Sequence, residues 1–218
     1  MGSATSGPGW VDVRAVVLDV GETLVDETRA WTQAAHDAGV TPLALMAVLG
    51  ALAERDEPHA RVWEVLGVPR PSTPTTIEPG DLYPDALPTL HALRRAGYLV
   101  AIAGNQPAGA EAQLRAAGVD LDLVASSARW GVAKPSPAFF ARVLAEIGLP
   151  AGDVLYVGDR LDNDVLPARA AGMRTAFLRR GPWGHVHALR PQVALADVRV
   201  DSLAELVDLL ARRGRGTG

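Results

Sequence analysis

The sequence has no cysteine, few aromatic residues and a single lysine. Without cysteine the chain can form no disulfide bond, no thiolate metal site and no cysteine nucleophile. The absence fits a reducing compartment, and we expect a cytoplasmic protein. Aromatic residues make up only 5% of the 218 residues, but 48% are hydrophobic, as in an ordinary globular protein. Fibrous and fully disordered chains are therefore excluded.

Long apolar runs and excess positive charge are also missing. The most apolar stretch, residues 42–53, is shorter than the roughly 20 residues that a membrane-spanning helix needs, and no signal peptide is visible. The formal net charge is −4, whereas a nucleic-acid-binding surface needs clustered cations. We expect neither a membrane nor a nucleic acid as a partner. The sequence does not indicate an oligomeric state.

The one lysine, Lys134, stands against twenty arginines. Lysine carries a compact point charge, whereas the charge of arginine is spread over a planar group, so the two are not equivalent. Lys134 lies in the segment GVAKPSPAFF, before a predicted helix that Pro135 and Pro137 help to start. Its position makes it a candidate functional residue.

Four segments repeat an amphipathic stretch, a glycine and a short apolar run. The glycines stand where a helix takes a left-handed C-terminal cap; they are Gly97, Gly118, Gly148 and Gly172. Each following run is typical of a strand buried on both faces. Residues 11–20 supply an earlier strand and residues 196–202 a late, minor one. The alternation predicts an α/β fold with a Rossmann-like parallel sheet.

The stretch between the first strand and the second unit breaks this alternation, because it contains helices and no strand. The predicted helices cover residues 26–39, 41–55 and 58–67. We interpret the insert, residues 26–80, as a small helical cap subdomain on a core formed by residues 11–25 and 81–213. Two short ends rich in small residues, 1–10 and 214–218, are expected to be a flexible arm and a flexible tail.

Polar residues follow three of the predicted strands. Asp19 ends the first strand, Gly104 and Asn105 end the second, and Asp159 ends the fourth. Because ligands of open parallel sheets bind beyond the carboxyl ends of the strands, we expect Asp19 and Asp159 to meet there. Two like charges at one site call for a cation, and oxygen ligands suit Mg²⁺. Lys134 is the only ammonium group that can assist.

The segments DVGETL, AGNQ, KPSPAFF and VGDRLDND, in this order, resemble the four motifs of the haloacid dehalogenase (HAD) superfamily. The resemblance extends from Val13 to about Leu178, and the helical insert resembles that family's first-type (C1) cap. It implies a Rossmann-like core and a Mg²⁺-dependent hydrolase, with phosphatase-type chemistry on a small phosphorylated metabolite.

The resemblance also implies a role for each motif residue. Asp19 would attack a phosphoryl group and form a covalent aspartyl intermediate, and Lys134 would pair with Asp19 and with the transferring phosphate. Asp159 and Asp164 would hold Mg²⁺ together with Asp19. The main-chain carbonyl of Gly21 would complete the set of metal ligands.

Two positions depart from the family's pattern. Its phosphatases usually carry a second aspartate two residues after the nucleophile, which serves as general acid and then as base, and here that residue is Gly21. Glu22 comes next, but we expect the strand-end geometry to point it differently. The hydroxyl of the second motif is replaced by Gly104, whose amide can still bind phosphate together with the side chain of Asn105.

These departures leave other functions open. A catalytically weak or inactive HAD-fold protein could bind a phosphorylated ligand or a protein partner. Dehalogenases of the family also lack an acid at this position, but they do not need Mg²⁺, whereas the acidic residues of GDRLDND are present here. Phosphonate-cleaving relatives use a cap lysine, and this cap contains none.

Several other polar and aromatic residues have simpler interpretations. We expect Asp162 to be a solvated loop charge, and His185 and His187 to lie on a loop after the fifth strand. Trp31 and Trp63 are expected to pack the core of the cap rather than to line a substrate pocket.

Overall fold

The computed structural model describes residues 13–74 and 76–214. The predicted flexible arm, residues 1–10, and residues 215–218 of the predicted tail lie outside the described residues. The described chain forms one six-stranded parallel sheet in the order β3-β2-β1-β4-β5-β6. The strands are β1 (Ala15–Leu18), β2 (Leu99–Gly104), β3 (Leu123–Ser126), β4 (Val154–Gly158), β5 (Arg174–Leu178) and β6 (Val198–Val200). The predicted α/β fold and the late minor strand are confirmed.

Strand β1 lies at the point where the strand order reverses. It pairs with β2 on one side and with β4 on the other, so that Leu18 is level with Ile102 and Val157. The residues that follow β1, β2 and β4 therefore leave the sheet side by side at its carboxyl edge. Parallel sheets bind their ligands at such a switch point.

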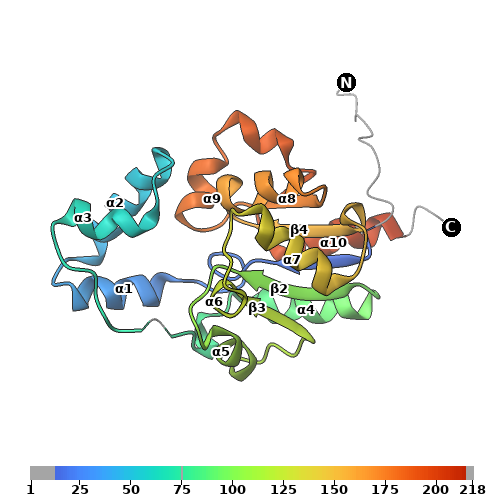
Figure 1. Ribbon diagram of the computed structural model, residues 1–218, viewed down its shortest axis with the longest axis horizontal. Coiled ribbons are helices and arrows are strands. Elements are labelled where there is room, and N and C mark those ends of the chain that lie inside the picture. The colour runs from blue at the N-terminus through green and yellow to red at the C-terminus, as the bar shows by residue number, and fades with distance from the viewer. Residues whose placement is uncertain (1–12, 75, 215–218) are drawn as a thin grey trace.

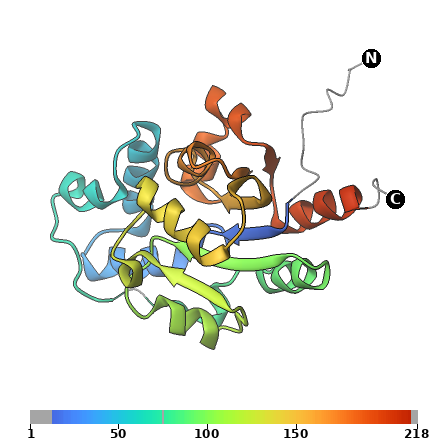
Figure 2. The same cartoon turned by 45° about the vertical axis from the view of Figure 1, so that its right-hand side comes forward.

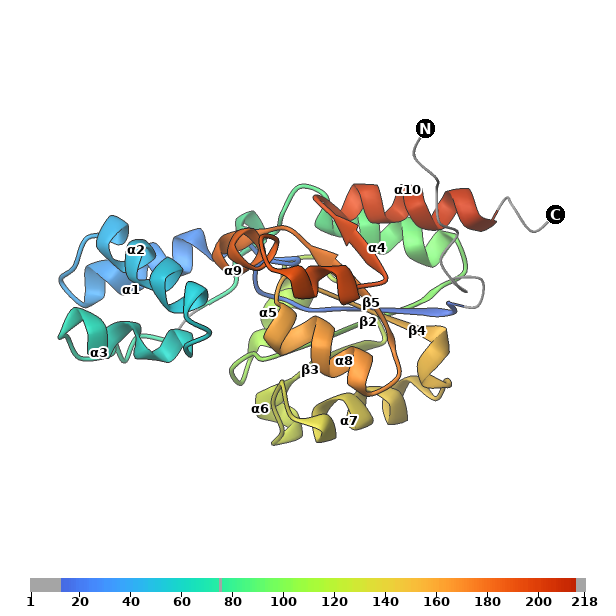
Figure 3. The ribbon, with the colours of Figure 1, turned by 90° about the horizontal axis from the view of Figure 1, so that it is seen from above.

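Helices cover both faces of the sheet, because the strand residues alternate between the faces. Val16 and Leu18 pack toward α4 (Ala86–Arg95) and α10 (Leu203–Gly214). Ala15 and Val17 of the same strand pack toward α7 (Pro137–Ile147) on the other face. Figure 3 shows these two helical layers above and below the sheet. The core helices not yet named are α5 (Ala110–Ala116), α6 (Ser127–Trp130), α8 (Leu166–Ala170) and α9 (Gly181–His187).

Short helical turns join several of these elements. They are 3₁₀ turns at His59–Arg61, Pro79–Asp81, Ala151–Asp153 and Pro191–Leu195, and a π-helical turn at Leu161–Val165. The four glycines predicted to end helices all have positive φ, from +70° to +101°. This left-handed backbone favours glycine, so the predicted pattern of helix, glycine and strand is confirmed.

Three helices lie between β1 and β2 and form the cap: α1 (Thr28–Asp37), α2 (Pro42–Glu54) and α3 (Val62–Leu66). They stand to one side of the sheet in Figure 1. The cap has its own hydrophobic core, in which Leu45, Leu49 and Trp63 are buried and Trp31 is partly buried. The expected packing role of Trp31 and Trp63 is confirmed. The boundaries of the predicted subdomains stay predictions.

The apolar character of α2 follows from this packing, because one side of the helix faces the cap core and α9. Among the described residues no single helix is long and apolar enough to span a membrane. The pair α1 and α2 passes the same test of length and composition only when taken together, across a bend of 114°.

The cap meets the core through the segment that follows β5. Trp183 of α9 belongs to the cap's hydrophobic cluster, and Arg190 donates to the carbonyl oxygens of Ala53 and Glu54 at 2.8 and 2.9 Å. Figure 2 shows α9 and the neighbouring turn between the cap and the sheet. Since β5 ends at the carboxyl edge of the sheet, the cap is docked at that edge.

The expectation of a loop at His185 and His187 is wrong, because both residues belong to α9. Pro182 occupies the first turn of this helix, and its fixed φ suits that position. His187 is fully buried, and its Nδ1 accepts a hydrogen bond of 3.0 Å from the backbone N–H of Leu161. The apolar side chains of Trp183 and Val186 pack against the cap. The histidines and glycines of GPWGHVH gave no sign of this packing in the sequence.

Candidate active site

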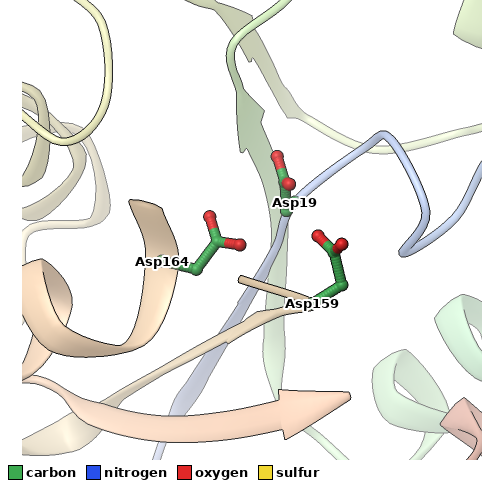
Figure 4. A group of neighbouring side chains, drawn as sticks. All are labelled: Asp19, Asp159 and Asp164. Atoms are coloured by element: carbon green, nitrogen blue, oxygen red, sulfur yellow. The ribbon is translucent and has the colours of Figure 1, made fainter. Parts of the chain in front are cut away.

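Three aspartates meet at the carboxyl edge of the sheet. Asp19 follows β1, Asp159 follows β4, and Asp164 lies on the π-helical turn after β4. Carboxylate oxygens of the three residues lie within 4.8 Å of one another, and all three side chains are buried. Figure 4 shows the carboxylates turned toward a common space. The predicted meeting of Asp19 and Asp159 is present, and Asp164 joins it.

Lys134 places its ammonium group inside this cluster. Its Nζ lies 2.6 Å from Asp19 Oδ1 and 2.5 Å from Asp164 Oδ1, and the side chain is buried. Burial alone would lower the pKa of Lys134, but the charges of Asp164 and Asp19 outweigh it and raise the pKa well above its ordinary value. The lysine therefore stays protonated and joins two of the three carboxylates.

Asn105 fixes the backbone of Lys134. Its Nδ2 donates to the Lys134 carbonyl oxygen at 2.9 Å, and its Oδ1 accepts from the Lys134 N–H at 2.8 Å. This use of the Asn105 amide was not predicted, because it joins residues 29 positions apart. One Nδ2 hydrogen is left for an anion, so the predicted contact of Asn105 with phosphate stays a prediction.

The three carboxylates carry more negative charge than Lys134 can balance. Burial, followed by the charges of Asp164 and Asp19, raises the pKa of Asp159 well above its ordinary value. Burial raises the pKa of Asp164 to about 6, although Lys134 opposes the shift. Like charges at one buried site favour a bound cation, and a ligand set made only of oxygen atoms suits a hard divalent ion. The site therefore fits Mg²⁺.

Two glycines make room for these carboxylates. A Cβ on Gly104 would stand 2.5 Å from Asp19 Oδ1, and a Cβ on Gly158 would collide with the Asp164 carboxylate. In this arrangement the Asp19 carboxylate occupies the space that a side chain at position 104, where the family's motif has a hydroxyl, would need. The hydrogen bond from the Gly104 backbone N–H to a bound phosphate stays a prediction.

Glu22 directs its carboxylate to partners of its own. Oε1 accepts from the backbone N–H of Glu27 at 3.0 Å, and Oε2 accepts from the Tyr83 hydroxyl at 2.6 Å. The backbone at Glu22 is left-handed, with φ of +51°, which sets the direction of its side chain. Glu22 therefore does not take the place of the missing aspartate at Gly21, in line with the expectation that it points differently.

Glu27 fills that place instead. A Cβ on Gly21 would stand 2.5 Å from Glu27 Oε1 and 2.9 Å from Glu27 Cδ. Burial, followed by the negative charges of Glu22 and Asp19, raises the pKa of Glu27 to about 7, while a hydrogen bond from Trp31 Nε1 opposes the shift. The sequence did not single out Glu27, because it directly precedes the first cap helix, where an acidic residue is ordinary. The glycine at position 21 was the available signal.

Asp162 stands apart from the aspartate cluster. Its carboxylate accepts from Arg160 Nε at 3.0 Å and from Arg160 Nη2 at 2.6 Å, and 39% of its side chain is exposed. The guanidinium of Arg160 also lies over the Trp183 ring, 4.7 Å from its centre. Asp162 is thus partly solvated, as expected, but it lies on the π-helical turn rather than on a loop, and it holds Arg160 between the core and the cap.

Comparisons with known proteins agree with this arrangement. The profile of the haloacid dehalogenase-like hydrolases matches residues 73–172. A glyceraldehyde 3-phosphate phosphatase of Methanopyrus kandleri is 34% identical over 131 residues, which are 59% of this chain and 56% of that protein. A phospholysine phosphohistidine inorganic pyrophosphate phosphatase of Bos taurus is 43% identical over 79 residues, 36% of this chain and 29% of that protein. The matched part of the chain thus spans about half the length of the first relative and less than a third of the second.

A solved structure described as a dehalogenase resembles the whole fold, cap included. It superposes with a TM-score of 0.70 at 25% sequence identity, and the match covers 92% of this chain and 98% of that one. The profile covers part of the segment that joins the cap to α4 and the second, third and fourth motifs, while the structural match extends to the first motif and the cap. Residues 73–172 therefore match the haloacid dehalogenase-like hydrolases, and the chain has the fold of a solved dehalogenase.

Proposed function

We propose that this protein is a Mg²⁺-dependent phosphatase that acts on a small phosphorylated metabolite through Asp19 as nucleophile. The observation that carries the proposal is the buried cluster of Asp19, Asp159 and Asp164, with Lys134 in contact with two of the three. Such a cluster is costly to fold unless it binds charge, and phosphate with a divalent cation supplies charges of both signs.

Asp19 is suited to attack phosphorus. It lies where β1 ends at the switch point of the sheet, and the contact of Lys134 Nζ with its Oδ1 orients the carboxylate. Asp159 and Asp164, with Asp19 and the Gly21 carbonyl, would hold Mg²⁺. When bound, this ion supplies electrostatic stabilisation of the charge on the transferring phosphoryl group.

Phosphate would be held by donors around Asp19. The Gly104 amide and the Asn105 side chain follow β2, which is the neighbour of β1, and Lys134 adds its positive charge. Donors arranged before the reaction stabilise transition-state charge at little cost in reorganisation. The cap lies at the same edge of the sheet, which favours a small substrate enclosed between core and cap.

The named relatives support the class of substrate. Both are named as phosphatases, and the one of Methanopyrus kandleri is named for glyceraldehyde 3-phosphate. A cytoplasmic location, and the absence of nucleic-acid and membrane partners, stay predictions, and the oligomeric state is open.

Release of inorganic phosphate from a panel of small phosphate esters, with Mg²⁺ and with a chelator, tests the proposal. We expect release that requires Mg²⁺ and is lost in Asp19→Asn. A parallel assay of halide release from 2-haloacids tests the dehalogenase alternative. Phosphate release that persists in Asp19→Asn, or halide release without phosphate release, would overturn the proposal.

Gly21 favours a second candidate, a weakly active protein that binds a phosphorylated ligand. It has no side chain to protonate a leaving group, so turnover could be lost while the phosphate site is kept. Binding of phosphate esters in the presence of Mg²⁺, without phosphate release from any ester of the panel, would support this candidate instead.

A further inference from the structure

Hydrolysis of an alkyl phosphate at this site needs a proton that the four clustered residues do not offer. An alkoxide is a poor leaving group, so its oxygen must be protonated as the P–O bond breaks. Asp19 is the proposed nucleophile, and Lys134 is shared between Asp19 and Asp164. Asp159 and Asp164 belong to the proposed metal site. A further group must carry the proton.

The Glu27 carboxyl group stands beside Gly21, two residues after the nucleophile. Its Oε1 lies 2.5 Å from the point where a Cβ on Gly21 would be, and its Oε2 lies 3.4 Å from the same point. The carboxyl group of Glu27 therefore takes up the space that an acidic side chain at position 21 would fill. Glu27, which directly precedes the cap helix α1, can occupy this space because Gly21 has no side chain.

Contacts on both sides keep the Glu27 carboxyl group in this place. The indole Nε1 of Trp31, one helical turn further on, donates to Oε2 at 3.2 Å, and the backbone N–H of Glu27 donates to Glu22 Oε1 at 3.0 Å. Within the described part of the chain, Oε1 has no hydrogen-bond donor. The residue as a whole is partly buried, and Oε1 is the carboxyl oxygen that these contacts leave available to exchange a proton.

We propose that Glu27 is the proton carrier of the reaction and replaces the side chain that Gly21 lacks. The inference rests on the proposed phosphatase function. In the first step an Asp19 carboxylate oxygen bonds to phosphorus, the P–O bond to the leaving group breaks, and the leaving oxygen takes the Glu27 proton. In the second step water attacks phosphorus, Glu27 takes a proton from that water, and the P–O bond to Asp19 breaks. Inorganic phosphate leaves, and both carboxyl groups return to their starting states.

The dependence of the rate on the leaving group separates proton transfer from a structural role. Glu27→Gln keeps the size of the side chain and an oxygen for Trp31. On an alkyl phosphate we expect kcat/KM to fall by roughly 10²- to 10⁴-fold, the scale of general acid catalysis. On an aryl phosphate with an acidic phenol the first step needs no proton, so one equivalent of phenol should appear quickly. Phosphorylated protein should then accumulate, because the second step lacks its base.

Glu64→Gln is the matched control, since it makes the same change at an exposed glutamate of the cap helix α3. Glu64 pairs with Arg61 away from the aspartate cluster, and we expect less than about a threefold change on either ester. Thermal unfolding of both variants checks that they fold.

Moving the carboxyl group back to position 21 gives a second test. Gly21→Asp alone places its side chain against the Glu27 carboxyl group, so it should not raise activity. Glu27→Ala removes both the proton carrier and the obstacle. On an alkyl phosphate, kcat/KM of the double variant Gly21→Asp/Glu27→Ala should be at least about tenfold higher than that of Glu27→Ala.

The outcomes distinguish this inference from the proposed function. If Asp19→Asn is inactive but Glu27→Gln keeps the wild-type rate on the alkyl ester, the phosphatase function stands and the role of Glu27 is wrong. Equal losses on the aryl first step and on the alkyl ester, with no recovery in the double variant, also contradict the role. A wild type that hydrolyses no ester overturns both proposals.

Discussion

Lys134 donates to Asp164 across 2.5 Å, and both side chains are almost completely excluded from solvent. The two residues lie 30 positions apart, on the loop before α7 and on the turn after β4. Because Asp19 shares the same ammonium group, one lysine joins three segments at the carboxyl edge of the sheet. The only lysine of the chain thus holds the centre of the site together.

Removal of this cation should destabilise the fold. Lys134→Met leaves Asp19 and Asp164 buried without their partner, and breaking a buried ion pair in this way costs about 3–5 kcal/mol. We expect the free energy of unfolding, measured with urea, to fall by that order. Arg142→Met is the control, because Arg142 pairs with Glu146 on the surface of α7 and such pairs contribute at most about 1 kcal/mol. Similar losses in the two variants would contradict the account of Lys134.

Mg²⁺ should stabilise the wild type by binding the aspartate cluster. A hundredfold excess over Kd stabilises a folded protein by about 2.7 kcal/mol, which for a chain of this size raises Tm by about 5–10 °C. Asp159→Asn should lose this rise. Without Mg²⁺ the same variant should be more stable than wild type at pH 7, because it removes a carboxylate whose raised pKa shows that its charge opposes folding.

Asp162→Asn is the control for the metal site, since Asp162 pairs with Arg160 and lies outside the cluster. It should keep the full Mg²⁺-dependent rise in Tm in a thermal unfolding scan. An Asp159→Asn variant that is stabilised by Mg²⁺ as strongly as wild type would show that the ion binds elsewhere.

The sequence could predict the fold and the place of the site, because both depend on local patterns. The helix-ending glycines, the apolar strand runs and the polar residues after three of the strands predict where Asp19 and Asp159 meet. Glu27 and the Asn105 clamp could not be found in this way. The contact of Asn105 with Lys134 joins residues that are 29 positions apart in the sequence. The place of Glu27 depends on the path of the backbone, which is left-handed at Glu22.

The helix at residues 181–187 could not be predicted from the sequence either. Its glycines and histidines favour a loop by local propensity, but Trp183 and Val186 are held by the cap, and His187 bonds the turn after β4. Tertiary packing outweighs local preference there.

Gly104→Ala should reduce activity by displacing the nucleophile. The added Cβ would stand 2.5 Å from Asp19 Oδ1, an atom that Lys134 holds in place. We expect kcat/KM to fall by at least about tenfold, since small displacements of reacting groups are costly. Gly50→Ala is the control, because a Cβ there meets no atom within 4 Å and α2 accepts alanine. Unchanged activity in Gly104→Ala would mean that Asp19 does not act from this position.

Stability should decrease in mildly acidic solution because of His187. Burial lowers the pKa of His187 below its ordinary value near 6.5, an effect that Asp162 opposes and that Arg190 and Arg160 reinforce. The unfolded chain then binds a proton that the folded chain excludes. The free energy of unfolding should fall as the pH drops below about 6.5, by at most about 1.4 kcal/mol per pH unit, until the folded pKa is passed.

Unfolding by urea at pH 8 and at pH 5.5 measures this effect. His187→Gln should lose stability at pH 8 but show a weaker dependence on pH than wild type, whereas His36→Gln, at an exposed position of α1, should behave like wild type. An unchanged pH dependence in His187→Gln would assign the effect to other groups.

Detection of a phosphoryl group on Asp19 tests the central claim most directly. The wild type is mixed with Mg²⁺ and an aryl phosphate, quenched in acid within the first turnover, and analysed by intact mass and peptide mapping. We predict a gain of one phosphoryl group, located on the peptide that contains Asp19 and absent from Asp19→Asn. Phosphate release at the wild-type rate from Asp19→Asn, or a phosphoryl group found on another residue, would contradict the account.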